Sequence, residues 1–228
     1  MSAPANTPTP SDRVLLWRWL AATFTYPDAE IWQWLTTPGF ALPTPTAPTL
    51  DEQCATFLAI FGHTVRGDCP PHELEYGELK ADALYQPHRL ADIAAFYSAF
   101  GLEIVPEMAD RVDHIAMECE FYAVLCAKEE VAAENLDLCR DAQKKFLREH
   151  LARWTPAFSR RLARLAGDPF YRAVADILHR AILAECDRHH LRPGNADLHL
   201  RPVEEMVDVC GSCGISGAAF PGGGQDGE

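Results

Sequence analysis

The fold of this chain is decided by one stretch, residues 111–122, which reads Arg111-Val112-Asp113-His114-Ile115-Ala116-Met117-Glu118-Cys119-Glu120-Phe121-Tyr122. Charged and titratable side chains open the stretch, and an apolar helical pattern follows them. At a period of about 3.6 residues the apolar side chains form two adjoining stripes, namely His114, Met117, Phe121 and Leu125, and Ile115, Cys119, Tyr122 and Cys126. A helix with two apolar stripes packs against neighbours on several sides, so this stretch predicts a core helix.

The Asp113–His114 pair at the beginning of this helix has two interpretations. In the first, Asp113 belongs to the first helical turn, where a carboxylate offsets the free backbone N–H groups. In the second, the pair belongs to a functional surface. The local sequence alone favours the first interpretation, and the rest of the chain bears on the second.

The remainder of the chain is also dominated by helical patterns. Helical periodicity extends over residues 11–25, 28–35, 50–61, 87–100, 137–151, 154–165 and 168–190. No alternating strand pattern persists for a strand's length, and no repeat of solenoid length is present. The sequence therefore predicts an all-α fold, as a single helical-bundle domain of about eight or more helices.

Three regions are expected along the 228 residues. Residues 1–10 form a flexible N-terminal arm, residues 11–190 the all-helical domain, and residues 191–228 a Gly- and Pro-rich tail. No apolar run approaches the ~18 residues of a membrane span, and the N-terminus does not have the pattern of a secretory signal. Eight cysteines are most simply explained as reduced thiols. We therefore expect a cytoplasmic protein without stable membrane insertion.

Charge and motifs limit the possible functions. A net charge of −13 argues against nucleic acid as a partner and suits a basic partner such as an arginine-bearing peptide, although acidity also serves solubility. Phosphate-binding glycine motifs and the common hydrolase and metalloprotease motifs are absent from the sequence. Asp113, His114, Glu118 and Glu73 could act as acid–base groups, but this signal is weak. The chain is expected not to be an enzyme, with no catalytic residues and no cofactor.

A Cys-x-x-Cys motif, Cys210-Gly211-Ser212-Cys213, lies in the tail. Zinc and iron–sulfur sites normally have four ligands, and a second such motif is missing. Cys186 could complete a mixed set only if the tail folds back. A pair of free thiols and a transient metal contact both stay open, and with them an alternative function as a metal-handling or iron–sulfur assembly factor acting through Cys210 and Cys213.

Three stretches, taken in order, resemble the TorD/DmsD (NarJ-like) family of cytoplasmic chaperones for molybdenum-cofactor oxidoreductases. They are Pro70-Pro71-His72-Glu73-Leu74-Glu75-Tyr76-Gly77, Leu90-Ala91-Asp92-Ile93-Ala94-Ala95-Phe96-Tyr97-Ser98-Ala99-Phe100-Gly101-Leu102, and residues 111–121. The last is similar to the Glu-x-Pro-x-Asp-His signature of the family. The match extends over roughly residues 11 to 190, but no proline stands just before Asp113, and the Cys-x-x-Cys tail lies outside the match.

The resemblance implies an all-helical chaperone that binds the twin-arginine signal peptide and the apo form of a molybdoenzyme catalytic subunit. It would assist cofactor insertion and proofreading before export. The resemblance places Asp113 and His114 at the binding surface, with Tyr76 nearby. It leaves open the identity of the client enzyme and the choice between a monomer and a domain-swapped dimer.

Physical reasoning adds further candidates for this surface. A receptor for two arginines followed by an apolar run needs carboxylates beside an apolar groove. Asp113 could pair with an arginine, and Glu120 could extend the acidic edge or be ordinary surface charge. Tyr97, Phe100 and Phe121 could line the groove or belong to the core.

Overall fold

The fold is known from a computed structural model that describes residues 11–37, 41–62, 67–77, 86–103, 111–132 and 134–201. These ranges contain eight α-helices: α1 (Asp12–Phe24), α2 (Ala29–Thr36), α3 (Leu50–Phe61), α4 (Gln86–Ala99), α5 (Ile115–Val131), α6 (Leu136–Phe146), α7 (Ala152–Leu165) and α8 (Pro169–Arg188). A 3-10 turn at Glu73–Glu75 and a π-helical turn at Leu147–Leu151 accompany them. Within the described ranges, β-structure is limited to two isolated bridges. The predicted all-α class is therefore confirmed.

The number of helices differs slightly from the prediction. The backbone stays helical from α6 through the π-helical turn into α7, so the described part has seven separate helices and not eight or more. The sequence pattern predicts a break between residues 151 and 154. No break occurs there, because Leu151 continues the helical conformation into α7.

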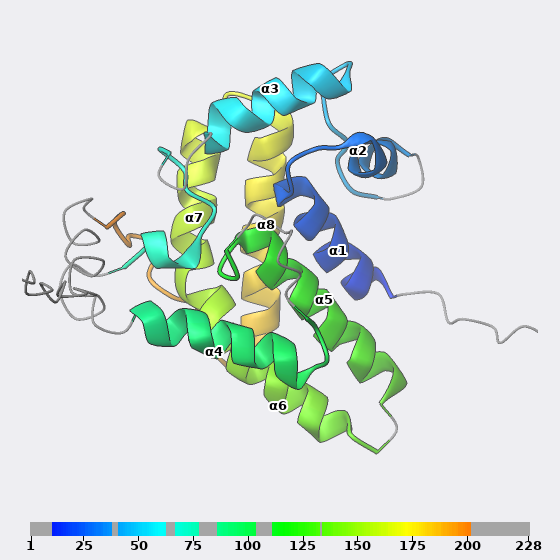
Figure 1. Cartoon of the computed structure of the whole chain (residues 1–228), viewed down its shortest axis with the longest axis vertical. Helices are drawn as coiled ribbons and strands as arrows, with labels where there is room; N and C mark the ends of the chain where they lie inside the picture. The colour runs from blue at the N-terminus through cyan, green and yellow to red at the C-terminus, as the bar shows by residue number, and fades with distance from the viewer. Residues whose placement is uncertain are drawn as a thin grey trace, which may run out of the picture.

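Helix α5 lies at the centre of the bundle, as the two apolar stripes predict (Figure 1). Helix α1 runs antiparallel to it, since Arg13 near the beginning of α1 bonds Glu129 near the end of α5 at 2.7 Å. Trp17 of α1 packs edge-on against Tyr122 of α5, with 4.8 Å between ring centroids. Helices α7 and α8 form a second pair beside this one (Figure 1).

Local sequence signals fix several helix starts. The side chains of Ser11, Asp28 and Asp168 each accept a hydrogen bond from a backbone N–H of the first turn of α1, α2 and α8. Pro169 is the first residue of α8, where its missing N–H costs no helical hydrogen bond. These starts agree with the sequence prediction to within one residue, because capping depends only on neighbouring residues.

Residues 191–201, which we name the C-terminal strap, lie against the bundle and reach residues 75–77 (Figure 1). Pro156 of α7 has no N–H to bond the carbonyl oxygen of Ala152 four residues earlier. The N–H of Gly194 in the strap donates to that oxygen instead, at 2.8 Å. The division of the chain into arm, domain and tail stays a prediction, but this part of the expected tail contacts the helical domain.

The described helices do not include one that combines the length and apolar character needed to cross a membrane.

Candidate functional site

Two loop segments singled out by the sequence, residues 70–77 and 111–114, lie against each other. Two backbone hydrogen bonds join them, from the N–H of Glu73 to the carbonyl of Asp113 at 2.9 Å and from the N–H of Ile115 to the carbonyl of Pro71 at 2.8 Å. Together they form an antiparallel bridge between His72 and His114. The rings of these two histidines meet edge-on, with 4.9 Å between centroids. Burial and the neighbouring His114 lower the pKa of His72 to about 3, so His72 is neutral at physiological pH.

The carboxylate of Asp113 is fully buried and is already bonded within the protein. Arg111 donates to both of its oxygens, from Nε to Oδ1 at 2.9 Å and from Nη2 to Oδ2 at 2.6 Å. The backbone N–H of Leu74 also donates to Oδ2, at 3.0 Å. Asp113 therefore ties the two loop segments together. It does not serve the first turn of α5, because the N-cap is His114, whose Nδ1 accepts from the N–H of Ala116 at 3.1 Å.

Arg111 covers a second buried carboxylate as well. Its Nη1 lies 2.9 Å from Oε1 of Glu75, whose side chain is 3% exposed. The side chain of Arg111 itself is 27% exposed, so its guanidinium separates both carboxylates from solvent. Burial lowers the pKa of Arg111, but the hydrogen bonds and charges of Asp113 and Glu75 outweigh burial, and the net effect is a raised pKa.

Two further carboxyl groups, those of Glu73 and Glu118, are buried near these segments. Glu73 is buried, and its Oε2 lies 3.0 Å from Nδ1 of His150, while Nε2 of His150 lies 3.1 Å from Oδ2 of Asp92 on α4. Fully buried Glu118 accepts from Nε1 of Trp154 at 3.1 Å. Burial, and then the nearby charge of Glu73, raise the pKa of Glu118 well above its ordinary value.

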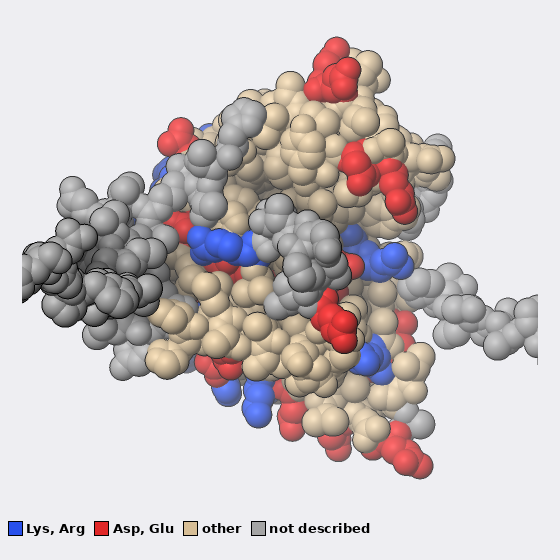
Figure 2. Space-filling view, in the orientation of Figure 1, with Lys and Arg blue, Asp and Glu red and all other residues tan. Residues whose placement is uncertain are grey.

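An open hollow of about 430 Å³, which we name the α1–α2–α5 groove, lies beside the first turns of α5. Its lining comes from α1, α2 and the first turns of α5, and consists of Arg18, Ala21, Ala22, Thr25, Glu30, Ile31, Trp34, Ala116, Met117 and Glu120. Most of these side chains are apolar, and two carboxylates and one guanidinium accompany them. In Figure 2 acidic side chains lie at the top, at the upper right and along the lower edge of this face, and basic side chains lie across its middle and at its lower edge.

The predicted binding residues, all of them described, are not gathered in one place. Glu120 is exposed and alone among them lines the groove. Tyr97 of α4, Phe100 just after it and Phe121 of α5 form an aromatic cluster, with Phe121 4.9 Å from Tyr97 and 5.8 Å from Phe100 between ring centroids. Tyr76 is buried against α7. The structure thus places these four aromatic residues in or against the core.

Sequence reasoning missed the α1 and α2 sides of the groove, which include Arg18, Glu30, Ile31 and Trp34. A signal was present on α2, where Glu30, Ile31 and Trp34 share one helical face and combine a carboxylate with two large apolar side chains. The sequence could not show that α1 and α5 leave this face uncovered.

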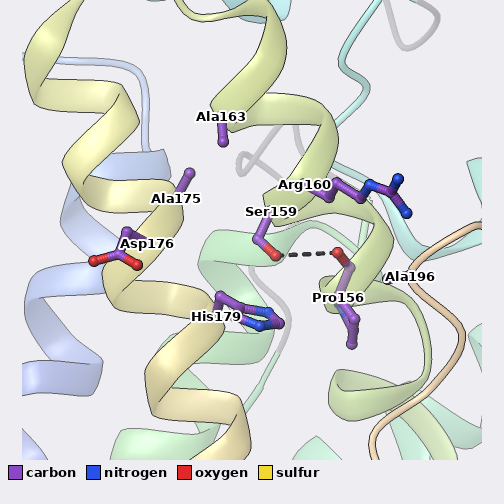
Figure 3. Close-up of a pocket in the computed structure, with 8 residues that line it drawn as sticks. All are labelled: Pro156, Ser159, Arg160, Ala163, Ala175, Asp176, His179 and Ala196. Atoms are coloured by element: carbon purple, nitrogen blue, oxygen red, sulfur yellow. Dashed lines mark hydrogen bonds between the residues drawn. The ribbon is translucent and has the colours of Figure 1, made fainter.

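A second hollow, of about 360 Å³, lies between α7 and α8 and is shown in Figure 3. It contains Ser159, Asp176 and His179, but their bonding does not form a nucleophile and its base. The hydroxyl of Ser159 donates to the carbonyl of Pro156 at 3.2 Å, and the carboxylate of Asp176 pairs with Arg180 at 2.8 Å. The hollow has mainly small apolar walls.

Metal binding finds no support in the part of the chain that is described. No group of three or more His, Cys, Asp or Glu side chains there could hold a metal ion. The described cysteines are free thiols, and burial raises the pKa of Cys69 and of Cys126 to about 12 each. Cys210 and Cys213 lie outside the described residues, so the suggested metal contact there stays a prediction.

The described part of the chain is thus all-helical and carries an apolar groove with two carboxylates in its lining. Residues 27–160 match the family model described as nitrate reductase delta subunit, and the chain belongs to this family. Relatives include the selenate reductase assembly chaperone of Thauera selenatis, at 34% identity over 63% of this chain and 72% of that protein. The chlorate reductase assembly chaperone of Ideonella dechloratans is 30% identical over the same shares of the two chains.

A TorD chaperone of Vibrio cholerae is also similar, at 26% identity over 54% of this chain and 56% of that protein. These relatives confirm the resemblance to the TorD family that the three sequence stretches indicated. Since they are chaperones and not catalysts, they also confirm the prediction that the chain is not an enzyme.

Proposed function

We propose that this protein is a maturation chaperone that binds the apo catalytic subunit of a molybdenum-cofactor reductase and its twin-arginine signal peptide. It would act in the cytoplasm, assisting cofactor insertion and holding the subunit back until export is allowed. Membership in a family with assembly chaperones of selenate and chlorate reductases supports this class of client.

The α1–α2–α5 groove is the observation that carries the proposal. A signal peptide of this kind joins two arginines to an apolar run, so it needs carboxylates next to apolar surface. Glu30 and Glu120 are exposed carboxylates at the edge of the groove, and Ile31, Trp34 and Met117 supply large apolar side chains within it. In this proposal the carboxylates bind guanidinium groups and the apolar side chains receive the hydrophobic run.

Arg18 on α1 places a positive charge at one end of the groove, so that the two ends differ in charge. Because α1 runs antiparallel to α5, Arg18 is nearer the middle of α5, while Thr25 is nearer its first turn. The guanidinium of Arg18 would repel a peptide arginine at that end. The peptide arginines are therefore expected toward the beginning of α5, and the apolar run along α1 and α2.

The test is binding of a synthetic peptide with two adjacent arginines and an apolar segment, measured by isothermal titration calorimetry. Replacing Glu120 by Gln should weaken binding about tenfold, since a charge-assisted bond to an arginine contributes roughly 1.4 kcal/mol or more. Replacing Glu30 by Gln should have a similar effect.

Asp141→Asn is the matched control, because Asp141 is an exposed carboxylate on α6, outside the groove lining. This variant loses the same charge and should bind the peptide like the wild type. If the peptide does not bind at all, or if all three variants bind it equally well, the groove is not the signal-peptide site.

A further inference from the structure

The buried carboxylates of Asp113 and Glu75 form a complete arginine-binding site, and the protein's own Arg111 occupies it. Nε and Nη2 of Arg111 make two parallel bonds to Asp113, at 2.9 and 2.6 Å, and Nη1 bonds Glu75 at 2.9 Å. This two-pronged pairing with a carboxylate is the geometry with which proteins recognise an arginine of a ligand.

Exposure decides which of these groups a ligand could meet. Asp113 is 0% exposed and Glu75 3%, whereas the side chain of Arg111 is 27% exposed. A peptide arginine can therefore reach Asp113 only by taking the place of Arg111. The site stands immediately before α5, whose next turns supply Ala116 and Met117 to the groove.

We propose that Arg111 is an internal substitute for one arginine of the bound peptide, and that binding exchanges Arg111 for a peptide arginine at Asp113 and Glu75. This inference rests on the proposed function, because it assigns a binding site to one arginine of the same signal peptide. Arg111 then swings into solvent, where its charge is hydrated, and the peptide guanidinium takes over its three bonds.

The exchange has a physical advantage over an open carboxylate site. Leaving one partner of a buried ion pair without the other is strongly destabilising, and an arginine is present at Asp113 both before and after the exchange. Since the peptide must compete with Arg111, only a group that makes the same parallel bonds can replace it. A lysine has no planar fork, so the site selects arginine over lysine.

Arg111→Lys tests the exchange in a variant that keeps the positive charge over both carboxylates. A lysine is displaced more easily than an arginine, so this variant should bind the twin-arginine peptide about tenfold more tightly than the wild type, by removing the competing state. Arg140→Lys is the matched control, because Arg140 pairs with Glu129 at the far end of α5 at 2.9 Å, and its affinity for the peptide should stay at the wild-type value.

Arg111→Ala supplies a second measurement that does not use the peptide. It leaves the buried carboxylate of Asp113 without the guanidinium that pairs with it, so the variant should melt at a lower temperature than the wild type. Adding N-acetyl-arginine amide at millimolar concentration should raise the melting temperature of this variant by several degrees, and N-acetyl-lysine amide should not. The wild type should respond to neither compound.

Two outcomes separate this inference from the proposed function. If the wild type binds the peptide through Glu30 and Glu120 while Arg111→Lys leaves the affinity unchanged or lower, the exchange is overturned and the function stands. If the arginine compound restores Arg111→Ala but no form of the protein binds the peptide, the arginine site is real and the signal-peptide function is overturned.

Discussion

Single residues in this protein owe their chemistry to burial, and Glu118 shows the effect most directly. Its carboxyl is fully buried, and burial together with the charge of Glu73 raises its pKa. The unfolded chain has an ordinary glutamate there, with a pKa of about 4.3. Glu118 therefore binds a proton more tightly in the folded state, and its contribution to stability, complete below that unfolded pKa, is lost as pH rises toward the folded pKa.

Glu118→Gln should remove this loss, because the amide is neutral at every pH and its oxygen can still accept from Trp154. At pH 8 the variant should be more stable than the wild type, and at pH 4 the two should be close. Urea denaturation at a series of pH values measures this difference. A gap that does not widen with rising pH would mean that Glu118 is ionised in the folded protein.

The contacts of single residues were also the hardest feature to predict from the sequence. Asp113 and His114 were recognisable as a pair, and three stretches in order identified the family. That Asp113 is bonded to Arg111 two residues earlier, and buried beneath residues 70–77, depends on a contact between distant segments. No local pattern encodes such a contact.

At the scale of elements, helix positions followed from local signals while one junction did not. Helix α3 has the predicted bounds, and α8 begins at the predicted Asp168–Pro169 cap. The predicted break between α6 and α7 is absent, and a π-helical turn takes its place. There His150 bonds Glu73 and Asp92, which are far away in sequence, so tertiary contacts override the local pattern.

The contact of the C-terminal strap with α7 is a testable element-level feature. A side chain at Gly194 would collide with the backbone carbonyl of Arg153, so Gly194→Ala must push the strap away from α7 and break its bond to Ala152. We expect a loss of about 1–3 kcal/mol in the free energy of unfolding, measured by urea denaturation.

At Gly167 an added methyl group would meet nothing within 4 Å, so Gly167→Ala is the control and should be close to neutral. Equal stability of the two variants would mean that the strap does not hold α7.

At the scale of the whole molecule, net charge should govern how fast a basic peptide arrives. The chain carries −13 at neutral pH, and the arginines of a signal peptide are attracted to it from beyond contact distance. Raising the salt concentration from 50 to 300 mM shortens the screening length, so the association rate should fall several-fold while the dissociation rate changes less. Stopped-flow fluorescence with a labelled peptide measures both rates. Glu120→Gln should instead act mainly on dissociation, because it removes a contact of the bound state and only one of many charges. An association rate independent of salt would show that apolar contacts, and not the acidic surface, bring the peptide to the groove.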